Sequence, residues 1–307
     1  MNADAVRPRT TRLAARRRRV TFRGMTLSTP LTDLRPARVA LVHAHPDDET
    51  LWTGVTIAHL VRAGVEVHVV TCTLGEEGEV IPPALRHLEG DGPALAAHRR
   101  EELRRATAAL GATSHVLGED GDGPRWRDSG MAGSPASQHR SAFASGGEEA
   151  AAALAEVLGT IGPDTVITYE RTGGYGHPDH VATHRTTHAA LRRLAEPPRL
   201  LEVVVPRSWA VADREWLTEH VHRTDVRVPG PDEAYPSSVV PDELVTHVVV
   251  DAAASAVQAA ALREHATQAT VHDGYYALSN DVAARLSGRE AYRLVRVEGA
   301  AAGGAHE

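Results

Sequence analysis

Two short segments of the chain combine histidine with carboxylates at a spacing that suits metal chemistry. The first is His45-Pro46-Asp47-Asp48-Glu49, and the second runs from Gly173 through His177-Pro178-Asp179-His180. Three adjacent carboxylates and a histidine are costly to crowd together unless a positive charge neutralises them. A solvated turn that caps a helix is the alternative for the first segment. The glycines of the second segment would let the backbone approach a ligand closely.

Together the two segments offer two histidines and one carboxylate as metal ligands. This set fits a catalytic zinc site with open positions for water, and it also fits a non-heme ferrous site. A further carboxylate and a His-Asp pair would remain for proton transfer and for binding an oxyanion, as metal-assisted hydrolysis requires. The residues therefore indicate a hydrolase. A non-heme iron oxygenase is the alternative from a different class, and it would also need oxygen and a co-substrate.

Both segments follow a strand-like apolar run and open a helical pattern, which predicts how they are positioned. Expected strands cover residues 39–43, 65–73, 114–117, 164–168, 200–205, 245–250 and 291–297. Expected helices cover residues 49–63, 98–110, 148–160, 179–195 and 252–266. This alternation predicts an α/β, Rossmann-like fold with a mostly parallel sheet and helices on both faces. The two segments should then meet at the carboxyl edge of the sheet, where such folds bind ligands.

The chain divides into three parts by charge and pattern. Residues 1–36 are expected to form a basic, disordered arm, residues 37–205 the Rossmann-like core with the metal site, and residues 206–307 a less regular part. This last part is expected to pack on the core and to complete the substrate pocket. The connections 74–97 and 118–147 follow strands and are long for a compact domain, which is typical of functional loops.

Composition excludes several classes of protein. Residues 1–36 hold nine arginines and two acidic residues, so they carry about +7 and the remaining residues about −14. A basic arm of this kind could bind an anionic surface. The favoured explanation of the basic segment is that the protein starts at Met25. The negative charge of the remaining residues argues against nucleic-acid binding. One cysteine excludes a disulfide framework. There is no apolar run of membrane-spanning length and no secretory signal, so we expect no membrane partner and a cytoplasmic location.

The paired motifs resemble those of the PIG-L/LmbE-like zinc deacetylases, which act on N-acetylglucosamine conjugates. The loop motifs at residues 71–81, 125–133, 173–180 and 265–268 are similar to those of the actinobacterial branch that deacetylates N-acetylglucosaminyl-inositol in mycothiol biosynthesis. The resemblance runs from about residue 37 to residue 297 and is weak over 206–245. It implies hydrolysis of the acetamide of a small pseudodisaccharide. The related amidase that cleaves mycothiol S-conjugates is the alternative within the family, although the Leu74–Gly78 motif favours the deacetylase.

The resemblance also implies a role for each site residue. His45, Asp48 and His180 would ligate zinc, with ferrous iron as the other possible ion, and Asp47 would be the general base that deprotonates the metal-bound water. His177, oriented by Asp179, would stabilise the oxyanion or protonate the leaving amine, assisted by Tyr175. The residues that would line the sugar and inositol pocket are Arg99, Asp128, Met131 and Glu79.

Overall fold

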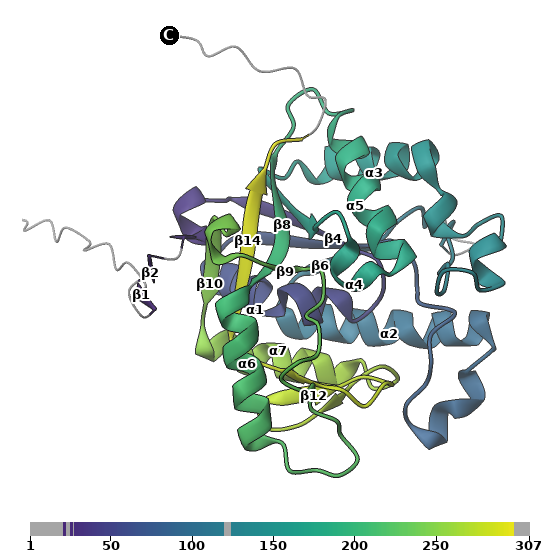
Figure 1. Cartoon of the computed structure of the whole chain (residues 1–307). Coiled ribbons are helices and arrows are strands. Elements are labelled where there is room, and N and C mark those ends of the chain that lie inside the picture. Colours follow the sequence, from purple (N-terminus) through teal and green to yellow (C-terminus); the bar gives the residue numbers. More distant parts are fainter. Residues whose placement is uncertain (1–20, 23–24, 27, 120–123, 298–307) are drawn as a thin grey trace, which may run out of the picture.

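The computed structural model describes residues 21–22, 25–26, 28–119 and 124–297. A nine-stranded sheet crosses the molecule (Figure 1). Its strands are β3 (Thr29–Pro30), β4 (Arg38–His43), β5 (Glu66–Thr71), β6 (Thr113–Val116), β7 (Thr165–Tyr169), β8 (Arg199–Pro206), β9 (Val239–Val240), β10 (His247–Val250) and β14 (Arg289–Val295). Their order is β3-β10-β14-β8-β7-β4-β5-β6, with β9 beside β8. Strands β4 to β8 are parallel, and β14 is antiparallel to both β8 and β10. The predicted mostly parallel sheet is confirmed.

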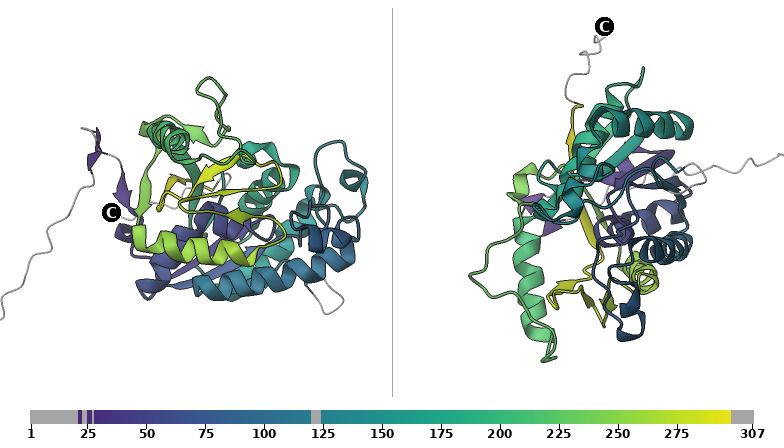
Figure 2. Two further views of the ribbon diagram at one scale, coloured as in Figure 1. Left: turned by 90° about the horizontal axis from the view of Figure 1, so that it is seen from below. Right: turned by 90° about the vertical axis from the view of Figure 1, so that its right-hand side faces the viewer.

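Helices cover both faces of the sheet, and β4 is therefore buried on both sides. Val39 and Leu41 join one hydrophobic cluster, whereas Ala40 and Val42 join another, as the alternation of side chains along a strand requires. Helices α1 (Asp48–Arg62), α2 (Gly92–Leu110) and α7 (Ala252–Glu264) pack on the first face. Helices α3 (Gly147–Ile161) and α5 (Pro178–Leu191) pack on the second, and Figure 2 shows the two layers from two sides.

The expected helices and strands of the core are present, with shifted ends. Helix α2 begins at Gly92, six residues before the expected start, because the Asp91 carboxylate accepts a hydrogen bond from Ala94 N at 3.2 Å and caps the helix. Helix α5 ends at Leu191 rather than at residue 195. The C-terminal part holds elements that the sequence did not predict: α6 (Arg207–His220) and a small sheet of β11 (Thr270–Val271), β12 (Tyr275–Ala277) and β13 (Ala283–Arg285).

The N-terminal segment is folded over part of the length assigned to the basic arm. Strand β3 pairs with β10, and Leu31 is fully buried in the cluster that α1 covers. The arm prediction is therefore wrong for residues 29–34, because an isolated leucine gave no periodic signal of burial. Residues 1–20 of the predicted arm lie outside the described residues. Within the part of the chain that is described, we find no helix with the length and apolar character needed to cross a bilayer.

Candidate active site

The two histidine–carboxylate segments meet at the carboxyl edge of neighbouring strands. β4 ends at His43 and leads through His45 into α1, while β7 leads through the short helix α4 (Gly173–Gly176) into α5. The His45 ring lies 4.7 Å from the His177 ring and 5.3 Å from the His180 ring, centroid to centroid. The parallel pairing of β4 and β7 thus brings together side chains that are more than 130 residues apart in the chain.

Two imidazole nitrogens converge on one oxygen of Asp48. His45 Nε2 lies 3.2 Å from the Asp179 carboxylate, and His180 Nδ1 lies 3.1 Å from the Gly173 carbonyl oxygen. When each ring is neutral and donates through this contact, its lone pair is on His45 Nδ1 or on His180 Nε2. Each of these two nitrogens lies 3.3 Å from Asp48 Oδ2.

This donor set fits a divalent metal ion. Ligand atoms that lie 2.0–2.1 Å from a tetrahedral zinc ion are about 3.3 Å apart, which matches the separations around Asp48. His180 Nε2 is buried and has no hydrogen-bond partner within the described residues. A buried acceptor without a donor is costly unless a cation or water meets it. The donor atoms of His45, His177 and His180 also lie within 4.8 Å of one another.

The charges of the cluster support the same assignment. Burial opposes the charge of Asp48, but His180 and His45 hold the pKa of this carboxyl well below its usual range. Burial also opposes a proton on His45, and Asp128, Asp179 and Asp48 overcome it and raise the pKa of His45. The carboxylates therefore attract a positive charge into the cluster, and a bound cation would supply it.

Asp47 lies beside this cluster in an unusual backbone conformation. Its φ is 104°, which is rare outside glycine. Asp47 N donates to Glu49 Oε2 at 3.1 Å, and the Gln268 amide donates to the Pro46 carbonyl oxygen at 2.7 Å. Burial, and next the charge of Asp48, raise the pKa of the Asp47 carboxyl well above its usual range. The side chain also lines the adjacent cavity.

Glu49 and His265 are site residues to which the sequence assigned no role. Both side chains are fully buried, and His265 Nε2 lies 2.7 Å from Glu49 Oε1. The other carboxylate oxygen of Glu49 holds the backbone of Asp47. The signals were present, because Glu49 completes the first motif and His265 opens the motif at 265–268, but only the fold shows that the two side chains meet.

Asp179 contacts His177 through its backbone N and not through its carboxylate, so the expected pairing of the two side chains is wrong. Residues two apart at a helix start do not face each other, and the Asp179 carboxylate turns to His45 Nε2 and to Ser129 N, the latter at 2.9 Å. His177 caps α5 instead, with its Nδ1 accepting from Asp179 N at 3.2 Å. Burial, and next His45 and His180, lower the pKa of His177 to about 4. Tyr175 is 56% exposed, with its ring 5.1 Å from that of His180.

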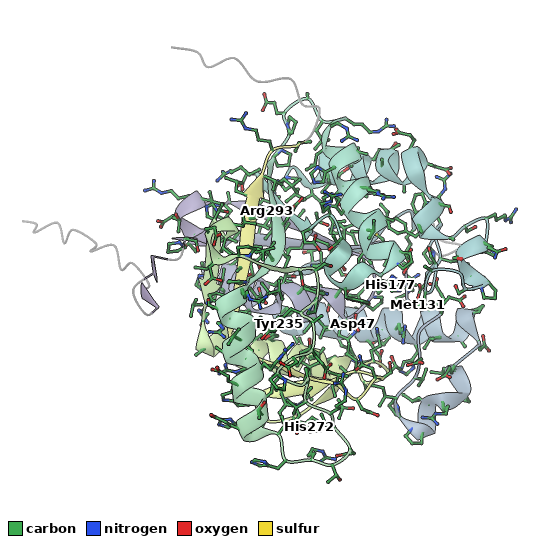
Figure 3. All side chains as sticks on the ribbon, viewed as in Figure 1. Asp47, Met131, His177, Tyr235, His272 and Arg293 are labelled. Carbon is green, nitrogen blue, oxygen red and sulfur yellow. The ribbon has the colours of Figure 1, made fainter. Side chains whose placement is uncertain are left out.

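The expected substrate-binding residues all border one cavity of about 760 Å³ that opens from the metal cluster. Asp128 is buried at the cluster, with Oδ1 3.6 Å from His45 Nε2, and Met131 is 59% exposed at the rim. Figure 3 shows Asp47, His177 and Met131 on the same side of the molecule. The Arg99 guanidinium is buried and donates to the carbonyl oxygens of Gly75 and Glu79, so it holds the 75–79 loop, while the Glu79 side chain is exposed.

The C-terminal part also lines the cavity. The residues it contributes include Trp209, Asp213, Gln268, Tyr276, Asn280, Arg285 and Arg289. Residues 77–79, 128, 130 and 131 of the two long connections line it as well. A cavity beside a buried group of metal donors, set at the carboxyl edge of a parallel sheet, defines a metal-dependent hydrolase of the α/β class.

Comparisons with known proteins agree with this class. A family model described as PIG-L: GlcNAc-PI de-N-acetylase matches residues 40–191. A protein of Actinosynnema mirum, named 1D-myo-inositol 2-acetamido-2-deoxy-alpha-D-glucopyranoside deacetylase, is 44% identical over 272 residues, which cover 86% of this chain and 94% of the relative. A protein of Nocardia farcinica with the same name is 45% identical over 83% of this chain and 89% of its own. The chain belongs to the PIG-L deacetylase family, and the resemblance seen in the motifs is confirmed.

Two solved structures are also similar to parts of this chain. N,N'-diacetylchitobiose deacetylase of Pyrococcus horikoshii is 19% identical, with a TM-score of 0.49 over 78% of this chain and 73% of that structure. The conserved protein TT1542 of Thermus thermophilus is 23% identical, with a TM-score of 0.44 over 75% of this chain and 79% of that structure.

Proposed function

We propose that this protein hydrolyses the acetamide of 1D-myo-inositol 2-acetamido-2-deoxy-α-D-glucopyranoside, releasing acetate and glucosaminyl-inositol as a step of mycothiol biosynthesis. The names of relatives that share more than 40% identity over most of both chains support this substrate. The observation that carries the reaction type is the approach of two imidazole nitrogens to one oxygen of Asp48 beside a cavity that Asp47 also lines.

His45, Asp48 and His180 are the proposed ligands, and zinc is the proposed ion, with ferrous iron as the alternative. When bound, such an ion polarises the acetamide carbonyl and lowers the pKa of an attacking water to about 7. Asp179 acts as a positioning residue, because its carboxylate fixes the tautomer and the orientation of His45. Gly173 does the same for His180 through its carbonyl oxygen.

Asp47 is the proposed general base. Within the described residues no hydrogen bond occupies its carboxylate, which is free to accept the proton of the attacking water. Its raised pKa makes it a stronger base than an exposed aspartate. The bonds from Glu49 and Gln268 keep this residue in its unusual backbone conformation and so aim the carboxylate into the cavity.

His177 and Tyr175 are proposed to meet the oxygen that becomes negative during attack. Because His177 Nδ1 accepts a hydrogen bond from Asp179 N, the proton of the neutral ring is on Nε2, which can donate. Tyr175 is exposed at the mouth of the cavity, where a hydroxyl can reach a bound substrate. Asp128 and Met131 are proposed to contact the sugar, whereas Arg99 acts on the substrate through the loop that it holds.

The test is a paired assay on purified protein. N-acetylglucosaminyl-inositol and a mycothiol S-conjugate are each incubated with enzyme, and acetate and free amine are measured. We expect acetate release from the first substrate to dominate, to stop after chelation and to return when zinc is added. Preferred cleavage of the conjugate would replace this proposal with the amidase, and turnover that survives complete metal removal would exclude the metal-assisted reaction.

A further inference from the structure

A second group of metal-ligating side chains lies on α5 and β8, apart from the cavity. His184 and His188 are four residues apart on α5, one and two turns after His180, and Glu202 lies on the neighbouring strand β8. One donor atom from each of the three lies within 4.8 Å of the donor atoms of the other two. The side chains of His184, His188 and Glu202 are 14%, 9% and 4% exposed.

The spacing places both imidazoles on the same carboxylate oxygen. Residues four apart on a helix share a face, so both rings point from α5 toward β8. Glu202 Oε1 lies 3.3 Å from His188 Nε2 and 3.5 Å from His184 Nδ1. The ring centroids of the two histidines are 4.4 Å apart.

The surroundings decide which nitrogen of each ring could bind an ion. His184 Nδ1 lies 3.1 Å from the Tyr169 carbonyl oxygen, and a proton donated there leaves the lone pair on His184 Nε2, which is the nitrogen that this ring would offer to an ion. His188 faces Glu202 with Nε2, and its Nδ1, on the other side of the ring, is buried without a hydrogen-bond partner within the described residues. Arg293 on β14 approaches Glu202 Oε2 at 2.5 Å, which leaves Oε1 turned toward the histidines. Figure 3 shows Arg293 away from Asp47 and His177.

We propose that His184, His188 and Glu202 form a second metal site, which takes a divalent transition ion such as Zn²⁺. Two imidazoles and one carboxylate make a borderline-soft ligand set that suits zinc and leaves one position for water. The site joins α5 to β8, so its ion stabilises the layer that carries His180. Tyr169 connects the two sites, because its carbonyl oxygen contacts His184 and its ring stacks on His180 at 4.3 Å.

Metal stoichiometry tests the proposal. Chelator-stripped protein is dialysed against free Zn²⁺ and its zinc content is measured. We expect two ions per chain in the wild type, one in His188→Gln, and two in the control His222→Gln, which changes an exposed histidine of the C-terminal part. His188→Gln should keep the deacetylase turnover of the wild type. A single ion per wild-type chain, or two ions in folded His188→Gln, would overturn the second site.

A second measurement locates the ion and does not depend on the folding of a variant. Anomalous diffraction from zinc-soaked wild-type crystals should show a peak between His184, His188 and Glu202 in addition to the peak at His45. The His180→Ala protein should retain one ion bound by two imidazole nitrogens in X-ray absorption. Anomalous density at His45 with none on α5 would refute the site, and this result would leave the proposed deacetylase activity intact.

Discussion

Asp47 shows how a catalytic carboxylate is built from its neighbours. Its φ of 104° is a conformation that persists only where surrounding contacts impose it. Those contacts come from Glu49 two residues away and from Gln268 far along the chain. Among the described residues none donates a hydrogen bond to the Asp47 carboxylate, while the Asp47 backbone is held.

Replacing Asp47 tests its proposed role as a base. Asp47→Asn keeps the size of the side chain but cannot accept the proton of water. We expect the metal content to be unchanged and kcat to fall by about 10²–10⁴-fold, which is typical for the loss of a general base. Steady-state kinetics and metal analysis on the same preparation check this. Unchanged kcat with full metal content would assign the base to another residue.

His265 has a predicted effect on stability. Its imidazole is the ion-pair partner of the fully buried Glu49, so His265→Ala leaves this carboxylate buried without the histidine that balances its charge. We expect a loss of about 3–5 kcal/mol in the free energy of unfolding. Urea denaturation measures it, and His222→Ala, at an exposed position, should change stability by less than about 0.5 kcal/mol. Equal effects in the two variants would show that the pair contributes little.

The turn between β7 and α5 decides where His180 lies. Gly173 has a φ of +67°, and a Cβ added there would come within 2.6 Å of His180 Cβ and 2.7 Å of Val181 N. Gly176 has a φ of +95° but no atom within 4 Å of such a Cβ. Both positions therefore favour glycine for backbone reasons, but only Gly173 is also required by the packing of His180.

This difference gives a matched pair of variants. Gly173→Ala and Gly176→Ala should share the backbone strain of a positive φ, of order 1–3 kcal/mol. Only Gly173→Ala should also displace His180, and we expect it alone to lose most of its bound metal and its turnover. Zinc content at equal free zinc is the measurement. Similar zinc content in both variants would show that the turn adjusts without moving the histidine.

At the scale of the whole molecule, the C-terminal part is built into the core. Glu290 on β14 accepts hydrogen bonds from Val55 N and Thr56 N in the middle of α1, both at 2.8 Å. The Gln258 amide of α7 donates to the Thr50 carbonyl oxygen of the same helix at 2.9 Å. These contacts cross more than 200 residues of sequence, so β14, α7 and α1 should unfold together.

Glu290 also makes stability depend on pH. Burial raises the pKa of its carboxyl to about 7, whereas an unfolded glutamate titrates near about 4.3. Between these values the folded state holds a proton that the unfolded state has lost, so the contribution of Glu290 to stability decreases as pH rises from about 4.3 to 7. Urea unfolding at pH 5 and pH 7.5 should show this decrease in the wild type and a smaller one in Glu290→Gln. Identical pH dependence in both proteins would contradict the assignment.

Local patterns in the sequence determined the strands β4 to β8, the helices between them and the two metal-binding motifs. The parallel sheet and the convergence of both motifs follow from that alternation, because the carboxyl ends of parallel strands share one edge. Short elements with few apolar residues, such as β11 to β13, gave no comparable signal. Leu31 was missed for the same reason, since burial of a single residue leaves no period in the sequence.

The tertiary structure alone decided which side chains touch. The Asp179 carboxylate contacts His45 rather than His177, because the start of α5 turns this carboxylate toward the loop after β4. His265 reaches Glu49 only because α7 packs beside α1. His184, His188 and Glu202 come together only because β8 lies beside α5. Residue types and local spacing can be read along a chain, but contacts between distant elements depend on packing that no local pattern encodes.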